Sequence, residues 1–206
     1  MDESPDAGMV ERDLADYYDQ EAADRAEREL GGRRIEARTR FLAILSPSFS
    51  LLEVGPGAGR DSGAFVEAGI GVVGVDLSHE QSRHASMSGA RPVVATVRRM
   101  PFADGTFDAL WTMSTLMHVP DSAIELALAE LRRVLSPGAL AAIGVWGGPD
   151  IEGAGDKDTY DPPRLFSRRS DARWETLLAA LGTVEQFENW HPDTDDFWYQ
   201  FAIVRR

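Results

Sequence analysis

The sequence predicts an α/β fold built on one doubly wound, mostly parallel sheet with helices on both of its faces. Three observations lead to this prediction. Short apolar runs alternate with runs of helical spacing, and strands joined by helical crossovers pair in parallel. A glycine-rich turn connects the first apolar run to the helix-like run that follows it. An acidic residue ends the second apolar run, at the sheet edge where such folds bind ligands.

Two helices are predicted ahead of the sheet. Residues 11–30 and 34–45 have apolar side chains at helical spacing, and Tyr17 and Tyr18 lie on the apolar side of the first run. A pair of glycines separates the two runs. The acidic residues 1–8 lack the apolar content of a packed segment, so we expect them to be disordered.

Seven apolar runs are predicted to form the strands. They cover residues 51–54, 72–75, 93–96, 107–113, 139–145, 183–188 and 197–204. The helices predicted between them cover residues 61–68, 78–87, 122–135 and 171–181. After the fifth strand, residues 147–164 are rich in glycine, proline and acidic side chains, and we expect a loop there.

The turn after the first strand leaves backbone amides uncovered. Gly55, Gly57 and Gly59 occupy every second position, so a ligand can lie against bare amides at a helix N-terminus. Asp76 ends the second strand, where an acidic residue commonly binds a ribose. The dinucleotide fingerprint needs a further glycine where this chain has Arg60. A nicotinamide cofactor is therefore disfavoured.

Four segments between residues 51 and 146 carry a resemblance to a known family. The first is Glu53 with the glycine turn, which reads acidic-x-Gly-x-Gly-x-Gly. The others are Met-Pro-Phe-Ala-Asp-Gly-Thr-Phe-Asp at 100–108, Leu-Met-His-Val-Pro at 116–120 and Glu-Leu-Arg-Arg-Val-Leu-Ser-Pro-Gly at 130–138. In type and order they resemble the motifs of the class I S-adenosylmethionine-dependent methyltransferases.

The resemblance implies a Rossmann-like, seven-stranded sheet with an antiparallel last strand, and S-adenosylmethionine as the cofactor. It implies one methyltransferase domain at residues 9–206, with 9–46 as a helical lid and 147–169 as a loop on the substrate side. The residues expected at the cofactor are Glu53, Gly55, Pro56, Gly57, Gly59, Asp76, Leu77, Thr96, Val97, Met113 and, from the lid, Tyr18.

One position departs from the family pattern. Relatives usually carry an aspartate that accepts a hydrogen bond from the adenine amino group, and this chain has Thr96 there, followed by Val97. A threonine hydroxyl accepts a hydrogen bond without the added strength of a charge. We expect cofactor binding to be weaker by about 1 kcal/mol, or a polar group to come from elsewhere in the chain.

His118 is the candidate catalytic residue, because it follows the fourth strand at the carboxyl edge of the sheet. A sulfonium methyl group is already activated, so a general base is optional and the acceptor mainly needs to be held in line. A role in lining the cofactor stays open as the alternative for His118. Tyr17, Trp146 and Tyr160 are candidate substrate contacts, with core packing as the alternative for Trp146. No histidine has metal-ligand spacing, so no metal is expected.

Charge and composition narrow the class of partner. The formal net charge of -13 opposes nucleic acid binding and favours a small acceptor that is neutral or cationic. The chain has no cysteine, which excludes a disulfide or a thiolate site. No apolar run is long enough to span a bilayer and the start is acidic, so we expect no membrane partner and a cytoplasmic monomer or homodimer.

These observations predict a methyltransferase that acts on an oxygen or nitrogen atom of a small metabolite. The alternative is a non-catalytic protein that binds S-adenosylmethionine or S-adenosylhomocysteine as a regulator or partner subunit. A dehydrogenase on a related fold would need the glycine that is missing at Arg60.

Overall fold

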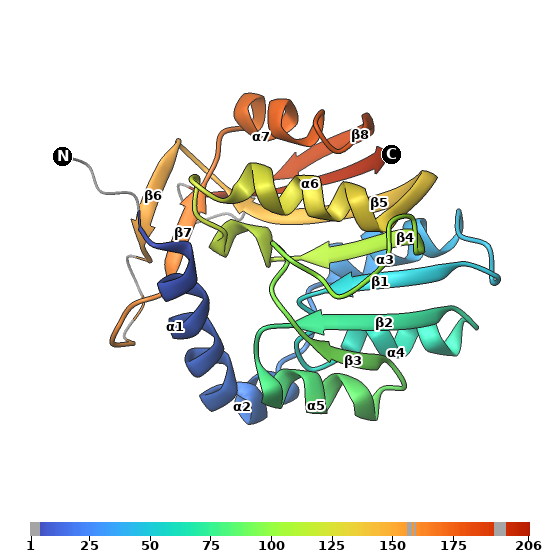
Figure 1. Ribbon diagram of the computed structural model, residues 1–206, viewed down its shortest axis with the longest axis horizontal. Helices are drawn as coiled ribbons and strands as arrows, with labels where there is room; N and C mark the ends of the chain where they lie inside the picture. The colour runs from blue at the N-terminus through green and yellow to red at the C-terminus, as the bar shows by residue number, and fades with distance from the viewer. Residues whose placement is uncertain (1–4, 156–157, 159, 192–196) are drawn as a thin grey trace.

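A seven-stranded sheet forms the centre of the computed structural model, which describes residues 5–155, 158, 160–191 and 197–206 (Figure 1). The strand order is β3-β2-β1-β4-β5-β9-β8, and β9 runs antiparallel to both of its neighbours. The strands are β1 (Ser50–Val54), β2 (Gly71–Asp76), β3 (Arg91–Val94), β4 (Phe107–Met113), β5 (Leu135–Gly147), β8 (Thr183–Trp190) and β9 (Trp198–Arg205). The predicted mostly parallel sheet with an antiparallel last strand is confirmed.

Helices cover both faces of this sheet. They are α1 (Ala7–Gln20), α2 (Ala22–Glu27), α3 (Gly32–Leu42), α4 (Arg60–Glu67), α5 (His79–Met87), α6 (Ile124–Val134) and α7 (Asp171–Leu178), with a 3-10 turn η1 (Leu116–His118). Alternate residues of a strand point to opposite faces. Leu52 and Val54 therefore pack with α6 and α7, whereas Leu51 packs with Phe41 of α3 and Phe65 of α4.

The N-terminal segment differs from its prediction. One predicted helix, residues 11–30, is two helices, and α1 already begins at Ala7. The Asp6 side chain accepts hydrogen bonds from the amides of Gly8 and Met9, which caps this helix. The predicted disordered tail is therefore wrong at residues 7 and 8, and residues 1–4 lie outside the described part of the chain.

The segment predicted as a loop at 147–164, and assigned to the substrate side through residue 169, contains a hairpin. Its strands are β6 (Ile151–Ala154) and β7 (Leu165–Arg168), which pair antiparallel apart from the main sheet. The Glu152 carboxylate accepts hydrogen bonds from the Ser167 hydroxyl and the Asp121 amide. These tertiary contacts stabilise a hairpin that the composition of the segment does not predict. Residues 156, 157 and 159 lie outside the described part.

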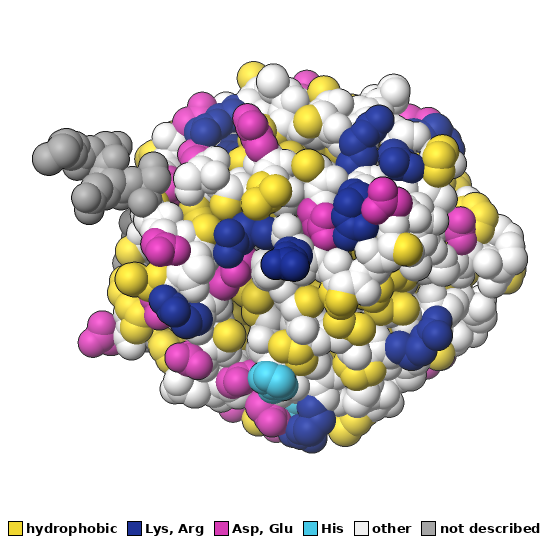
Figure 2. Space-filling model, viewed as in Figure 1, with side chains coloured by type: hydrophobic (Ala, Val, Ile, Leu, Met, Phe, Trp, Pro, Cys, Tyr) yellow, Lys and Arg dark blue, Asp and Glu magenta, His cyan; other side chains and the backbone are white. Residues whose placement is uncertain are grey.

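The carboxyl ends of β1, β2 and β4 meet at one edge of the sheet. Figure 1 shows α1, α2 and the β6–β7 hairpin at this edge. On the face shown in Figure 2, basic and acidic side chains lie interspersed, although the chain as a whole carries a net charge of -13. In the described ranges, every helix is too short or too polar to cross a membrane.

Candidate functional site

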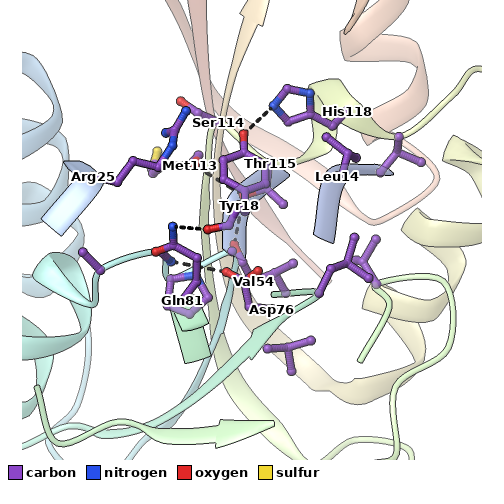
Figure 3. A pocket seen from close by; sticks show the side chains of 18 of the residues that line it. Leu14, Tyr18, Arg25, Val54, Asp76, Gln81, Met113, Ser114, Thr115 and His118 are labelled. Atoms are coloured by element: carbon purple, nitrogen blue, oxygen red, sulfur yellow. Dashed lines mark hydrogen bonds between the residues drawn. The ribbon is translucent and has the colours of Figure 1, made fainter. Parts of the chain in front are cut away.

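A cavity of ≈ 250 Å³ lies at the carboxyl edge of β1, β2 and β4, beneath α1 and α2 (Figure 3). It occupies the point where the strand order reverses between β1 and β4, which is where open α/β sheets bind ligands. Eight of the residues predicted at the cofactor line it, namely Gly55, Pro56, Gly57, Asp76, Leu77, Val97, Met113 and Tyr18. Glu53, Gly59 and Thr96 are not among the described residues of its wall.

The glycines of the turn have different tasks. Gly55 has φ +70°, and a Cβ there would lie 2.0 Å from Thr115 Oγ1, so the close packing of the protein requires this glycine. At Gly57 the nearest heavy atom to an added Cβ is Gln81 Oε1 at 3.8 Å. Gly57 thus exposes its backbone to the cavity, whereas Gly59 caps α4 against α5 and lies outside it.

Asp76 projects a carboxylate into the cavity from the end of β2. Its Oδ1 accepts a hydrogen bond from the Ser78 amide at 3.0 Å, and its Oδ2 accepts one from the Gly57 amide at 3.4 Å. Burial raises the pKa of Asp76 to about 6, and the backbone donors oppose that rise. The carboxylate is therefore ionised at neutral pH and can accept hydrogen bonds from ligand hydroxyls.

Glu53 lies behind the glycine turn and not in the cavity. It is 1% exposed, and its Oε2 accepts a hydrogen bond from the Ser62 hydroxyl of α4. Burial raises the pKa of Glu53 to about 8, and the nearby charge of Asp61 adds to the effect. The predicted cofactor contact at Glu53 is thus replaced by a support between β1 and α4, because alternation along β1 turns this side chain toward α4.

A carboxylate from α1 reaches the position at which the family pattern has an aspartate. The hydroxyl of Thr96 donates a hydrogen bond to Glu11 Oε1 and accepts one from the Arg98 amide at 3.1 Å, so its polar contacts are made within the protein. Arg98 binds the same carboxylate through Nε at 2.7 Å and Nη2 at 2.6 Å. Glu11 lines the cavity together with Val97. Sequence analysis missed Glu11, because 85 residues separate it from Thr96.

His118 and Tyr18 meet in the wall of the cavity, where a dashed line in Figure 3 joins them. The Nδ1 of His118 lies 2.8 Å from the carbonyl oxygen of Leu165, which can only accept, so Nδ1 carries the proton. The unprotonated Nε2 then accepts a hydrogen bond from the Tyr18 hydroxyl at 3.0 Å. Burial lowers the pKa of His118 to about 4. The imidazole is therefore neutral, with its lone pair directed at Tyr18.

The predicted substrate contacts are not in the cavity wall among the described residues. Tyr17 is buried behind Tyr18, with ring centroids 4.9 Å apart, and Tyr160 packs edge-on against Tyr17 at 4.3 Å. Trp146 packs edge-on against Tyr199 at 5.2 Å, between the two core clusters. The two tyrosines thus support the wall from behind, and Trp146 belongs to the packing of β5 against β9.

Several polar residues of the wall carry no sequence signal. Gln81 of α5 is buried, and its Nε2 donates a hydrogen bond to the Tyr18 carbonyl at 3.2 Å. The guanidinium of Arg25 lies 4.7 Å from the centroid of the Tyr18 ring. The charged residues of the wall are Arg25, Arg28, Arg34, Arg60, Arg98, Glu11, Glu29 and Asp76. The cavity wall is therefore rich in arginine. Its local charge cannot be inferred from the negative net charge of the whole chain.

Comparison with known proteins finds a family that the central part of the chain resembles. The sequence model of a family described as a methyltransferase domain matches residues 52–143. The matched segment runs from β1 into β5 and includes the glycine turn, Asp76 and His118. This central segment of the chain is similar to a methyltransferase domain.

Curated relatives share part of their length with this chain. It is 35% identical over 118 residues to Sterol methyltransferase-like 2 of Botryococcus braunii, an alignment that covers 52% of this chain and 30% of the relative. It is 31% identical over 111 residues to 2-methyl-6-phytyl-1,4-hydroquinone methyltransferase of Synechocystis sp., covering 51% of this chain and 34% of that protein. The chain thus matches about a third of the length of these relatives.

A solved structure supports the fold over nearly the whole chain. It is 1,6-didemethyltoxoflavin-N1-methyltransferase of Burkholderia thailandensis with bound 1,6-didemethyltoxoflavin and S-adenosylhomocysteine. The TM-score is 0.73 at 22% identity, and the match covers 98% of this chain and 91% of the solved one. At this identity the likeness establishes the fold.

Proposed function

We propose that this protein uses S-adenosylmethionine to methylate an oxygen or nitrogen atom of a small-molecule acceptor. The observation that carries the proposal is the pairing of the bare Gly57 backbone with the ionised Asp76 carboxylate in one cavity. A nucleoside with an aliphatic tail needs both an uncovered strip of backbone and an acceptor for two sugar hydroxyls.

The residues of the cavity fit this cofactor. Asp76 would hold the ribose, and the Gly55–Gly57 backbone would face the aliphatic tail. Leu77 and Val97 offer an apolar surface for the base, and Glu11 offers a carboxylate for its amino group. When bound, S-adenosylmethionine supplies a methyl group on a positively charged sulfur, which needs no further activation.

The hydrogen-bonded pair of Tyr18 and His118 would position the acceptor. An acceptor hydroxyl or amine that donates to the Tyr18 oxygen can release its proton along the bond from Tyr18 to His118 Nε2. With a pKa lowered to about 4, however, His118 is a weak base. We therefore assign orientation of the acceptor to this pair as its main task, with proton transfer to His118 as the secondary one.

Of the lid predicted at residues 9–46, α1 and α2 would cover the cavity, whereas α3 packs in the core through Phe41, within a single domain that spans residues 9–206. The Asp19 side chain of α1 accepts hydrogen bonds from the Ser78 hydroxyl and the Glu80 amide at the start of α5. Gln81 binds the Tyr18 carbonyl and Arg98 binds Glu11. All of these contacts join α1 to the edge of the sheet, so the lid would exclude water while it is closed.

Calorimetry with S-adenosylmethionine, S-adenosylhomocysteine and NAD tests the proposal, followed by transfer of a labelled methyl group to a panel of hydroxyl and amine metabolites. We expect both sulfur nucleosides to bind, NAD to remain unbound, and the label to reach at least one acceptor. Binding without any transfer would favour the non-catalytic alternative. If neither sulfur nucleoside binds, the proposed cofactor is wrong.

A further inference from the structure

Arg169 is a buried arginine that lies against the turn carrying His118. It follows β7 in the chain, and its side chain is 2% exposed. Its Nη2 donates a hydrogen bond to the carbonyl oxygen of Val119 at 2.8 Å, and its Nη1 donates one to the carbonyl oxygen of Leu116 at 3.4 Å. These two carbonyls stand on either side of His118 in the sequence. The guanidinium therefore holds η1 on both sides of the imidazole.

A carboxylate completes the contact of Arg169 with this segment. Asp121 Oδ1 accepts a hydrogen bond from Arg169 Nε at 2.9 Å, and Asp121 Oδ2 pairs with Arg173 of α7 at 2.8 Å. The Asp121 amide donates to the carboxylate of Glu152 in β6 at 2.5 Å. Residues 116–121 are thus fixed both to the arginine and to the hairpin.

The backbone of Arg169 is anchored to the main sheet. Its carbonyl oxygen accepts hydrogen bonds from Gln200 Nε2 of β9 at 2.9 Å and from the Gly148 amide, directly after β5, at 3.3 Å. Gln200 is fully buried. The side chain of Arg169 therefore reaches η1 from a main-chain position that the sheet holds.

The hydrogen bond of His118 Nδ1 needs two elements at a fixed spacing. The ring belongs to η1, whereas its partner at 2.8 Å is the carbonyl oxygen of Leu165 in β7. An N–H···O bond spans about 2.7–3.2 Å, so a shift of about 1 Å between the two elements would break it. Arg169 follows Leu165 by four residues and binds the backbone on both sides of His118. It is therefore placed to set this spacing.

Stability alone does not explain a guanidinium at this position. Burial of a charge is costly, and a well-packed apolar side chain often stabilises a protein as well as a buried ion pair does. An apolar side chain could not donate to the carbonyls of Leu116 and Val119. Arginine supplies a planar fork of donors that reaches both carbonyls and Asp121 at once, and lysine has no such fork.

We propose that Arg169 is a positioning residue for methyl transfer that acts through His118. It holds η1 against β7, which keeps the Nδ1 proton of His118 on the Leu165 carbonyl and the Nε2 lone pair on the Tyr18 hydroxyl. The inference rests on the proposed function, because that function assigns orientation of the acceptor to Tyr18 and His118. The state of the His118 ring can nevertheless be measured without acceptor or cofactor.

The test records nitrogen NMR spectra of the four histidines in wild type, Arg169→Lys and Arg169→Gln, with His118→Ala to assign the signal. We expect His118 of the wild type to be neutral, with its proton on Nδ1. In Arg169→Gln the proton should no longer be confined to Nδ1, and the pKa of the ring should rise from about 4 toward 6.5. Arg169→Lys keeps the charge without the fork and should show the same change to a smaller extent.

Arg205→Gln is the matched control. Arg205 also binds one carboxylate, that of Glu185, and one backbone carbonyl, that of Gly138, but at the opposite edge of the sheet. Its loss should leave the His118 signal as in the wild type. Cooperative urea unfolding shows which variants fold, and Arg169→Lys carries the test if Arg169→Gln does not. The affinity for S-adenosylhomocysteine should stay within about two-fold of wild type in every folded variant.

Turnover tests whether the effect passes through His118. With an acceptor from the labelled-methyl screen, Arg169→Gln should lower kcat about ten-fold, and it should have no further effect in a His118→Ala background. Additive losses would overturn the proposal. A His118 ring that keeps its wild-type tautomer and pKa in the folded Arg169 variants would also overturn it. A wild type that does not bind S-adenosylhomocysteine contradicts the proposed function, whereas the NMR spectra still decide whether Arg169 positions the ring.

Discussion

The two walls of the cavity differ in what they are made of. The wall from β1, β2 and the glycine turn presents backbone, and even its one carboxylate, Asp76, is held by the amides of Gly57 and Ser78. The opposite wall, from α1, α2 and η1, presents side chains that are held by other side chains, such as Tyr18 against His118. We call these the backbone wall and the side-chain wall.

This difference suggests a division of tasks. A backbone wall accepts a constant ligand, because its geometry depends on the turn and the strand ends. A side-chain wall can change from one protein to another without disturbing the sheet. We therefore expect the backbone wall to dominate the affinity for the cofactor, and the side-chain wall to dominate the rate with a given acceptor. Three predictions test this division, in order of decreasing effect on cofactor binding.

Asp76→Ala should have the largest effect. The loss of charge-assisted bonds to two ribose hydroxyls should weaken S-adenosylhomocysteine by at least ten-fold and up to about a hundred-fold, as measured by calorimetry. Glu67→Ala removes an exposed carboxylate from α4 and should change nothing. Because burial raises the pKa of Asp76 to about 6, wild-type affinity should also fall as the pH drops through 6. Unchanged binding by Asp76→Ala would contradict the expectation that the backbone wall dominates the affinity for the cofactor.

Tyr18→Phe and His118→Ala should affect turnover more than binding. We expect each to lower kcat by about ten-fold, while the affinity for S-adenosylhomocysteine changes less than about three-fold. If both act through the one hydrogen bond between them, the double variant should be no slower than the single variants. Additive losses would show that the two side chains act separately.

The pH dependence of turnover tests the same pair. His118 ordinarily titrates near 6.5, and burial lowers its pKa to about 4, so it stays neutral from mildly acidic to basic pH. At saturating cofactor, we expect the pH profiles of kcat for wild type and His118→Ala to have the same shape near pH 6.5. An inflection there that is present in wild type and absent from His118→Ala would contradict this expectation. Such an inflection would mean that His118 is charged and solvated in the working protein.

Glu53→Gln should have the smallest effect on binding, because Glu53 lies behind the backbone wall. Its pKa is raised from 4.5 to about 8, so the folded protein keeps a proton that the unfolded chain releases. The stability from this proton is fully present below pH 4.5 and is lost as the pH rises through 8. Between these two pH values, this proton contributes a slope of about 1.4 kcal/mol per pH unit to the free energy of unfolding, which decreases as the pH rises.

Urea unfolding of wild type and Glu53→Gln across this pH range measures that slope. We expect the free energy of unfolding of Glu53→Gln to depend less steeply on pH, with S-adenosylhomocysteine affinity within about two-fold of wild type. Identical slopes would show that Glu53 is ionised in the folded protein. A large loss of affinity for S-adenosylhomocysteine would show that Glu53 contributes to the cavity wall after all.

The backbone wall could be predicted from the sequence because its determinants are local. The glycine turn follows β1 directly, and Asp76 ends the next strand, so strand order alone brings them to one edge. Glu53 was placed at the cofactor because it belongs to the same motif. A motif does not specify the direction in which each of its side chains points. In β1, successive side chains point to opposite faces of the sheet, and Glu53 therefore faces α4.

The side-chain wall could not be predicted in the same way. The contact between Tyr18 and His118 spans 100 residues, and the one between Glu11 and Thr96 spans 85. The Leu-Met-His-Val-Pro motif predicts His118 at the site, but no pattern in the sequence indicates either contact. The β6–β7 hairpin was missed for the same reason, since Glu152 stabilises it through Asp121 and Ser167. Contacts between single side chains that are distant in the sequence produce no periodic pattern, so they cannot be predicted from the sequence alone.

The carbonyl group of Leu165 gives the hairpin a particular property. Any amino acid at this position presents the same main-chain oxygen to His118 Nδ1, so the tautomer of the imidazole depends on the pairing of β6 with β7 and not on their side chains. Substitutions in this strand pair that preserve its backbone pairing therefore leave the hydrogen bond from His118 Nδ1 in place.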